Sequence, residues 1–229
     1  DYVSSVNISC GFHAGDPLTI KEALLKAKGK NVVVGAHIGF HDIQGFGYRQ
    51  MDLDSDELDA LVTYQVGAIM TFAKAYHMEI EHVRPHGAMY RQASEDIEFS
   101  RTIAKAIKKC SKWLVYYGAT SDNLAQIAEE ENIQVAHEVH LEKIYDDKGN
   151  IDFSARDLEN TGISIQRLKD LIQNSQVTNN VGGKTIVRAD SIHFSNKLSN
   201  AKELIAQAYD IVEPLPYNYR NAQKSGWVE

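Results

Sequence analysis

The sequence has 229 residues, of which 43% are hydrophobic and 24% charged, so residues 1–229 can bury one substantial core and are expected to form a single domain. A net charge of -7, without a basic patch interleaved with aromatic residues, argues against a nucleic acid partner. No apolar run reaches about 18 residues and no signal peptide is recognisable, which predicts a cytoplasmic protein with no membrane association.

Strands and helices alternate along the whole chain. Apolar runs predict six strands, at residues 3–8, 32–36, 80–86, 113–117, 134–139 and 184–189. Amphipathic segments predict helices at residues 18–28, 54–76, 95–110, 121–131, 164–174 and 198–209. This alternation implies right-handed crossovers and a mainly parallel sheet, so the predicted class is α/β. The tail after Val212 is predicted to be an arm that packs against a second subunit in a homo-oligomer.

Histidines follow three successive predicted strands. His13 lies in the loop after the first strand, and His37 and His86 end the second and third. One such histidine alone is usually a turn residue held by a backbone hydrogen bond. Because the carboxyl ends of parallel strands meet at one rim, three in register predict a shared site. We expect these side chains to act as acid, base or metal ligands, with a divalent metal as an optional cofactor.

Other polar residues are candidates for binding substrate at the same rim. Asp16 caps the first helix, and Arg49 ends a loop rich in aromatic residues and glycine. The guanidinium groups of Arg49 and Arg84 can bind a carboxylate or phosphate, although a packed loop in which Arg49 pairs with a structural aspartate is an equal alternative. Glu138 is predicted at the end of the fifth strand as a catalytic carboxylate, and Asp190 at the end of the sixth as a substrate ligand.

The two cysteines carry little functional signal. Two cysteines, Cys10 and Cys110, are too few for a disulfide framework, and they are too far apart in the sequence to form a metal-binding motif of closely spaced cysteines. We expect small buried thiols that suit a reducing cytoplasm, with a local role at the site as the lesser alternative for Cys10.

Five ordered motifs carry a resemblance to a known family. They are Cys-Gly-Phe-His-Ala-Gly-Asp (10–16), Gly-Ala-His (35–37), Gln-Gly-Phe-Gly-Tyr-Arg (44–49), Tyr-Gln-Val-Gly-Ala (64–68) and His-Val-Arg-Pro-His-Gly-Ala-Met-Tyr (82–90). Over residues 2–191 the chain resembles the LamB/YcsF family, the A subunits of bacterial 5-oxoprolinase. The resemblance implies ATP-dependent opening of the 5-oxoproline lactam to L-glutamate, with ATP as co-substrate and subunits B and C as partners.

The resemblance also implies a seven-stranded (β/α) barrel of the glycoside hydrolase/deacetylase type. In the family a leading strand ends in an Asp-Leu-Asn-Cys-Asp-Leu-Gly-Glu-like motif, and this chain begins after it. We therefore expect a barrel that lacks its first strand. Such a barrel would have an uncovered edge beside residues 3–8.

Two segments depart from the family pattern. His-Glu-Val-His-Leu-Glu-Lys at 137–143 stands where members typically have Ser-Glu-Val-Phe-Ala-Asp-Arg, so Glu138 is kept. Ser195 and Lys197 stand where members have histidine and aspartate, with His193 as a neighbouring replacement for the histidine. These changes weaken the transfer of the family's activity to this chain.

No nucleotide-binding motif stands out. Gly182-Gly183-Lys184-Thr185 resembles the end of a phosphate-binding loop, but Thr178 replaces the first glycine and the segment leads into a strand rather than a helix. ATP chemistry would then use another kind of site or a partner protein. Two alternatives to the 5-oxoprolinase interpretation stay open: a metal-dependent hydrolase or deacetylase that acts without ATP, and a diverged, non-catalytic binding subunit.

Overall fold

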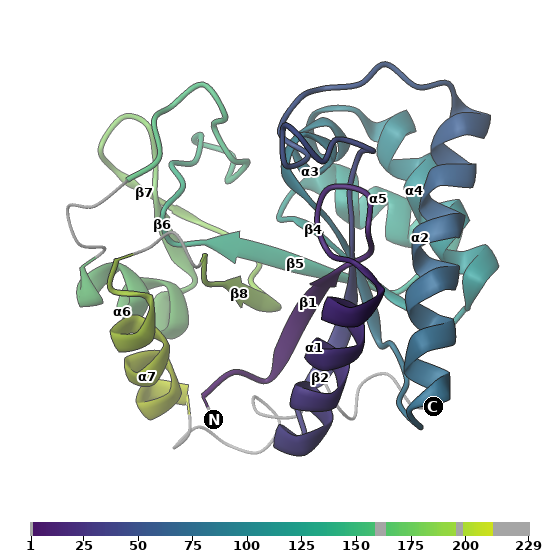
Figure 1. The fold of residues 1–229 in the computed structure, drawn as a ribbon. Helices are drawn as coiled ribbons and strands as arrows, with labels where there is room; N and C mark the ends of the chain where they lie inside the picture. Colours follow the sequence, from purple (N-terminus) through teal and green to yellow (C-terminus); the bar gives the residue numbers. More distant parts are fainter. Residues whose placement is uncertain (1, 159–163, 196–198, 213–229) are drawn as a thin grey trace. The chain divides into compact units, whose positions relative to one another are not determined.

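The computed structural model describes residues 2–158, 164–195 and 199–212 (Figure 1). The chain divides into two compact units. The first comprises residues 3–118 and 122–135, and the second comprises Tyr2, residues 119–121 and the chain from Ala136 onward. The single domain expected for residues 1–229 stays a prediction. Lys197 and the predicted arm after Val212 lie outside the described residues.

Four neighbouring strands form the sheet of the first unit. They are β1 (Ser5–Ser9), β2 (Val33–Ile38), β3 (His82–Pro85) and β4 (Val115–Ala119), whose last residue belongs to the second unit. Each pairs in parallel with the next, with Ser9 opposite His37 and His37 opposite Arg84. The α/β class with parallel strands, predicted from the alternation, is confirmed.

Five helices accompany these strands, and α1, α2 and α4 run beside them in Figure 1. They are α1 (Pro17–Lys30), α2 (Ser55–Ala75), α3 (Gly87–Glu95), α4 (Ile97–Cys110) and α5 (Asp122–Glu131). Asp16 caps α1, and Asp54 and Glu57 form a capping box on α2, as their sequence positions predict. α3 was not predicted. The cap of the next helix at Asp96 separates α3 from α4.

The core of the first unit lies between its sheet and its helices. Each fully buried Leu, Ile or Val contributes about 1.5–3 kcal/mol through removal from water. The core includes Ile8, Leu24, Val34, Ile38, Leu58, Val62, Ile69, Ile103 and Ile107.

The second unit combines a parallel strand pair with a small hairpin. β5 (Val135–His140), whose first residue belongs to the first unit, pairs in parallel with β8 (Ser191–His193), with His140 opposite His193. β6 (Gln176–Thr178) and β7 (Lys184–Ile186) pair antiparallel. The helices of this unit are α6 (Ile165–Asn174) and α7 (Ala201–Val212).

The prediction that residues 184–189 form the sixth strand of the parallel sheet is wrong. Residues 184–186 belong to the β6–β7 hairpin, and the strand parallel to β5 is β8. The cause is the turn before β7, where Gly182 has φ +81° and the Asn179 side chain accepts a hydrogen bond from the Gly183 amide at 2.7 Å. The same hairpin confirms that Gly182-Gly183-Lys184-Thr185 leads into a strand rather than a helix.

Among the described strands, β1 pairs with β2 alone, so the expected open edge is present beside residues 3–8.

In the described part of the chain, no helix has the length and apolar character needed to cross a membrane.

Gly35 allows β2 to pass close to a buried histidine. A Cβ at this position would lie 2.0 Å from Nε2 of His82, whose ring stacks on Tyr117 and hydrogen-bonds Asn7. We expect Gly35→Ala to lower the free energy of unfolding, measured in urea, by about 1–3 kcal/mol because the core has no room for the methyl group.

Gly67→Ala in α2 is the matched control. No described heavy atom lies within 4 Å of the methyl position, and alanine favours a helix over glycine by about 0.5–1 kcal/mol. This variant should therefore be as stable as the wild type or slightly more so. Equal stability of the two variants would contradict the packing described for β2.

Candidate active site

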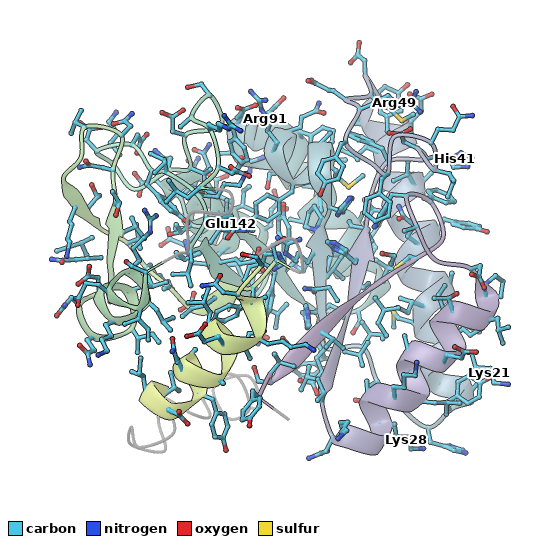
Figure 2. The ribbon with its side chains drawn as sticks, turned by 60° about the vertical axis from the view of Figure 1, so that its left-hand side comes forward. Lys21, Lys28, His41, Arg49, Arg91 and Glu142 are labelled. Atoms are coloured by element: carbon cyan, nitrogen blue, oxygen red, sulfur yellow. The ribbon has the colours of Figure 1, made fainter. Side chains whose placement is uncertain are left out.

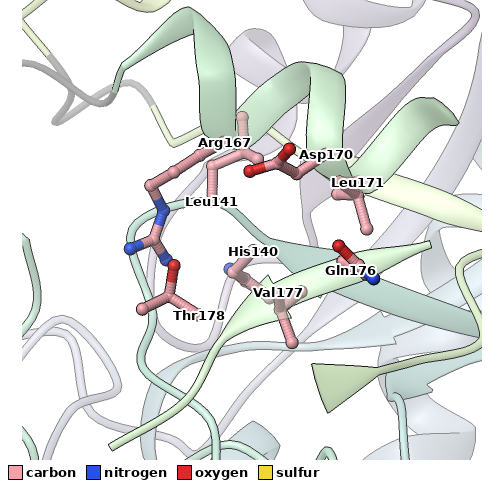
Figure 3. Close-up of a pocket in the computed structure, with 8 residues that line it drawn as sticks. All are labelled: His140, Leu141, Arg167, Asp170, Leu171, Gln176, Val177 and Thr178. Carbon is pink, nitrogen blue, oxygen red and sulfur yellow. The ribbon is translucent and has the colours of Figure 1, made fainter. Parts of the chain in front are cut away.

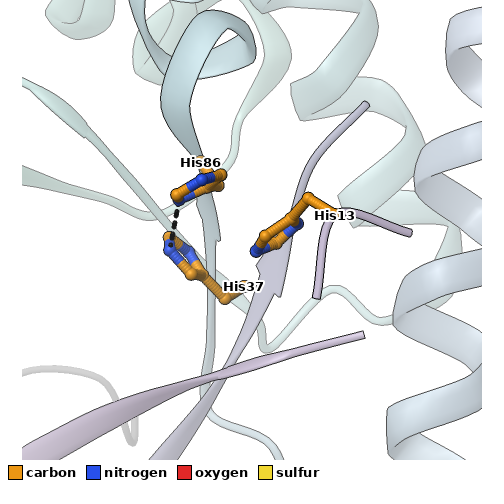
Figure 4. Close-up of side chains that lie close together, drawn as sticks. All are labelled: His13, His37 and His86. Atoms are coloured by element: carbon orange, nitrogen blue, oxygen red, sulfur yellow. Dashed lines mark hydrogen bonds between the residues drawn. The ribbon is translucent and has the colours of Figure 1, made fainter. Parts of the chain in front are cut away.

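Three histidine side chains converge at the carboxyl ends of β1, β2 and β3 (Figure 4). His37 lies in β2 opposite Ser9, His13 follows β1 by four residues, and His86 follows β3 directly and precedes α3. The His13 and His86 rings stack with centroids 4.1 Å apart. One nitrogen from each ring lies within 4.8 Å of the others. The structure thus brings together the three side chains that the strand ends predict; we call them the histidine cluster.

Backbone carbonyls fix the orientation of two rings. Nδ1 of His37 donates to the Arg84 carbonyl at 3.1 Å, and Nε2 of His86 donates to the Phe46 carbonyl at 2.7 Å. A carbonyl oxygen can only accept, so both ring nitrogens carry protons. The remaining nitrogens, Nε2 of His37 and Nδ1 of His86, face each other at 3.1 Å. Nε2 of His13 lies 3.0 Å from the Ser9 hydroxyl.

Burial keeps two rings of the histidine cluster, His13 and His37, from charging readily. Burial, with a smaller contribution from the neighbouring His86, lowers the pKa of His13 to about 3. Burial and then the Arg84 guanidinium hold the pKa of His37 well below its usual range. Neutral imidazoles act as bases or metal ligands at neutral pH.

The loop after β2 supplies one wall of the cluster. The Asp42 carboxylate accepts from the Gly45 amide at 2.9 Å and from the Arg49 guanidinium, which fixes the loop. Phe46 then adopts φ +54°, and its carbonyl reaches His86. A Cβ on Gly47 would lie 2.8 Å from both His13 and His86, so only glycine fits there.

The predicted arginine and aspartate ligands occupy varied settings. Arg49 pairs with Asp42, which is the structural alternative considered for it, and its side chain is 63% exposed (Figure 2). Asp16 is exposed and accepts from the Leu18 and Thr19 amides as an N-cap. Arg84 is buried, with its guanidinium carbon 4.6 Å from the Tyr90 ring centre. Substrate-binding roles for these residues stay predictions.

A second polar cluster lies within the second unit. His140 hydrogen-bonds Glu138 through Nε2 at 3.1 Å and Glu142 through Nδ1 at 3.2 Å, and all three are buried. His193 stacks obliquely on His140, with ring centroids 4.6 Å apart. Glu138 therefore lies inside β5 and not at its end as predicted, because β5 continues to His140.

Hydrogen bonding sets the charges of this second cluster. Burial alone would lower the pKa of His140, but Glu138 and Glu142 outweigh it and raise that pKa. Although burial opposes ionisation, His140 holds the pKa of Glu142 at about 2. The residues missed from sequence are His140 and Glu142. Their signal is the two-residue spacing from Glu138, which puts His140 on the same face of β5, with Glu142 two residues beyond the end of the strand.

Asp190 precedes β8 instead of ending a sixth strand, since the parallel strand begins at Ser191. Its carboxylate accepts from the His137 amide at 3.0 Å and pairs with Arg188. Its geometry is that of a strand-joining residue, and a role in substrate binding stays a prediction.

Two further features do not define a substrate site. Cys10 is buried, and burial raises the pKa of its thiol to about 12, which disfavours the thiolate that a nucleophile needs. A pocket of the second unit has a volume of only about 10 Å³, room for about one water molecule (Figure 3). It is lined by His140, Leu141, Arg167, Asp170, Leu171, Gln176, Val177 and Thr178.

The second cluster predicts pH-dependent stability. Glu142→Gln should lower the free energy of unfolding by about 1.5–3 kcal/mol at pH 6, because it removes a buried hydrogen bond to a charged imidazole. The pKa of Glu142 is lowered from 4.5 to about 2 on folding, so its contribution is complete above about pH 4.5 and is lost as the pH falls toward 2. Urea unfolding at several pH values measures this.

Glu203→Gln, an exposed change in α7 of the same unit, serves as the control and should shift stability by less than about 0.5 kcal/mol at any of these pH values. A loss in Glu142→Gln that stays constant down to pH 2 would show that the carboxylate is not held ionised by His140.

The sequence is similar to a known protein family and to named relatives. The model of the LamB/YcsF family matches residues 1–224. The chain is 35% identical over 216 residues to the A subunit of 5-oxoprolinase from a strain of Bacillus cereus, covering 93% of this chain and 85% of that protein. It is 33% identical over 209 residues to the A subunit of 5-oxoprolinase from Staphylococcus carnosus, covering 90% and 82%.

A solved structure is also similar. The crystal structure of a lactam utilization protein from Thermus thermophilus superposes with a TM-score of 0.83 and 34% sequence identity, covering 93% of this chain and 86% of that one. Both the sequence match over nearly the whole chain and the shared fold lead to one conclusion: the chain belongs to the LamB/YcsF family.

Proposed function

We propose that the chain is the A subunit of a 5-oxoprolinase, which opens the 5-oxoproline lactam to L-glutamate in an ATP-dependent reaction with partner subunits B and C in the cytoplasm. The observation that carries the proposal is the convergence of His13, His37 and His86 at three strand ends. The names of the relatives, lactam utilization protein and A subunit of 5-oxoprolinase, supply the substrate class.

The reaction needs groups that exchange protons. A lactam is a poor electrophile, and transfer of a phosphoryl group from ATP to its oxygen would activate the carbonyl carbon. Water then adds to that carbon, the C–N bond breaks, and its electron pair stays on nitrogen, which takes a proton. The acyl phosphate that remains is hydrolysed by a second water to L-glutamate and inorganic phosphate. The proton lost by water balances the one gained by nitrogen. A base and an acid must therefore lie beside the reacting carbonyl.

The histidine cluster meets this need in our proposal. A ring that is neutral at neutral pH accepts the proton from water, and the same ring can then return it to the leaving nitrogen. His86 is the strongest candidate because the Phe46 carbonyl fixes its ring and leaves Nδ1 toward His37. Arg49 and Arg84 remain candidates for the carboxylate of the substrate or the phosphates of ATP.

His86→Ala should lower ATP-dependent hydrolysis of 5-oxoproline, assayed with the partner subunits, by about a hundred- to ten-thousand-fold, the usual contribution of a general acid or base. His41→Ala is the control, since His41 is exposed on the same loop and its ring stacks on Phe12, outside the cluster. It should retain nearly full activity. A full rate in His86→Ala, with circular dichroism unchanged, would remove the cluster from the mechanism.

The same assay separates the proposal from its two alternatives, a metal-dependent hydrolase that acts without ATP and a diverged, non-catalytic binding subunit. Hydrolysis without ATP would favour a metal-dependent hydrolase. An inactive wild type whose activity appears after Ser195→His and Lys197→Asp would identify the chain as a diverged binding subunit, because these changes restore the family residues. We expect instead an active wild type that requires both ATP and its partners.

A further inference from the structure

Two rings of the histidine cluster face each other without a proton to share between them. The outer nitrogens of His37 and His86 must both carry protons, because each faces a carbonyl oxygen. The inner nitrogens lie 3.1 Å apart and need one more proton between them to form a hydrogen bond. That makes three protons, whereas two neutral imidazoles carry two. A cation that bridges the inner nitrogens would keep two lone pairs from facing each other in a buried site.

The third ring distinguishes a metal ion from a shared proton. A proton shared by two rings needs only His37 and His86. The structure adds His13, which is 1% exposed and offers a nitrogen within 4.8 Å of one nitrogen from each of the other two rings. Nε2 of His13 lies 3.0 Å from the Ser9 hydroxyl, and Nδ1, which has no hydrogen-bond partner in the described part of the chain, lies against Gly39.

The spacing of the His37 and His86 nitrogens is close to that of two ligands on a tetrahedral ion. Zinc–nitrogen bonds of about 2.0–2.1 Å at the tetrahedral angle separate two ligand nitrogens by about 3.3–3.4 Å. The inner nitrogens of His37 and His86 lie 3.1 Å apart, close to that value. Both rings also donate their outer N–H group to a backbone carbonyl, which is the usual outer-shell contact of a metal-bound histidine.

We propose that His13, His37 and His86 bind one divalent transition-metal ion of the zinc class. Three imidazoles and no carboxylate in this group favour zinc, cobalt or nickel over magnesium and calcium, which prefer oxygen ligands. Three protein ligands leave a fourth position for water or a substrate oxygen, so with the ion bound His86 would hold the metal and the water at that position would exchange the proton in the proposed reaction. The inference concerns the site of the proposed function but rests on the ring geometry, and metal binding is measured without any substrate.

The test uses the full chain without an affinity tag, treated with a chelator and then dialysed. Titration calorimetry should show one zinc ion bound per chain, with a melting temperature that rises on zinc addition and falls back with chelator. Cobalt added in place of zinc should give the intense visible absorption of a tetrahedral, nitrogen-bound ion. Magnesium should produce neither effect.

His37→Ala and His86→Ala should each weaken zinc binding by more than about 100-fold, beyond the loss expected for an outer-shell contact. His41→Ala should bind as the wild type does, since its ring lies outside the cluster. If His37→Ala or His86→Ala misfolds, His13→Gln gives the same comparison. Absence of zinc binding by the wild type, or equal binding by the cluster variants and His41→Ala, would overturn the proposal and leave a shared proton as the bridging cation. Failure of lactam hydrolysis alone would not affect it.

Discussion

Parallel pairing of β1, β2 and β3 brings together residues that are far apart in the chain. The register sets Ser9 beside His37 and His37 beside Arg84, so the histidines after each strand reach the same rim. Because side chains alternate in direction along a strand, a slip of one residue in this pairing would turn His37 to the other face. Buried aliphatic side chains of β2 pack against those of the surrounding helices, and this packing holds the register.

The loop after β2 turns this register into a defined site. Asp42 ties together the Gly45 amide and Arg49, and the resulting turn presents the Phe46 carbonyl to His86. Gly47 permits the loop to touch two of the rings. Arg49 thus contributes to the site by supporting the loop, whatever it does with a substrate. In the second unit, His140 between Glu138 and Glu142 shows another solution, in which buried charges compensate each other.

Local chemistry in the sequence predicts much of this structure. The capping box of Asp54 and Glu57 and the Asp16-Pro17 start of α1 act over one helical turn, so they are readable without the fold. The three strand-end histidines are readable because the parallel α/β class places such residues at one rim. The open edge at β1 is readable from the family resemblance.

The remaining features depend on tertiary contacts. Helix α3 starts at Gly87 with φ +55°, a position where helix propensity is poor, and is held by the contact of the Ala88 amide with the Gly47 carbonyl. The sixth parallel strand has only three residues, Ser191–His193, too short to be distinguished from a loop by periodicity. The partner of Arg49 could be anticipated only as an unnamed aspartate, because the turn that brings Asp42 to it is set by several backbone contacts.

The positions of the protons on the cluster rings test the site most directly. Nitrogen-15 NMR correlation of the imidazole side chains, assigned with single histidine variants, measures them at neutral pH. We expect protons on Nδ1 of His37 and Nε2 of His86, and upfield shifts typical of metal coordination on their inner nitrogens when zinc is added. The opposite tautomers, or ring nitrogens with no fixed proton, would contradict the arrangement of the site.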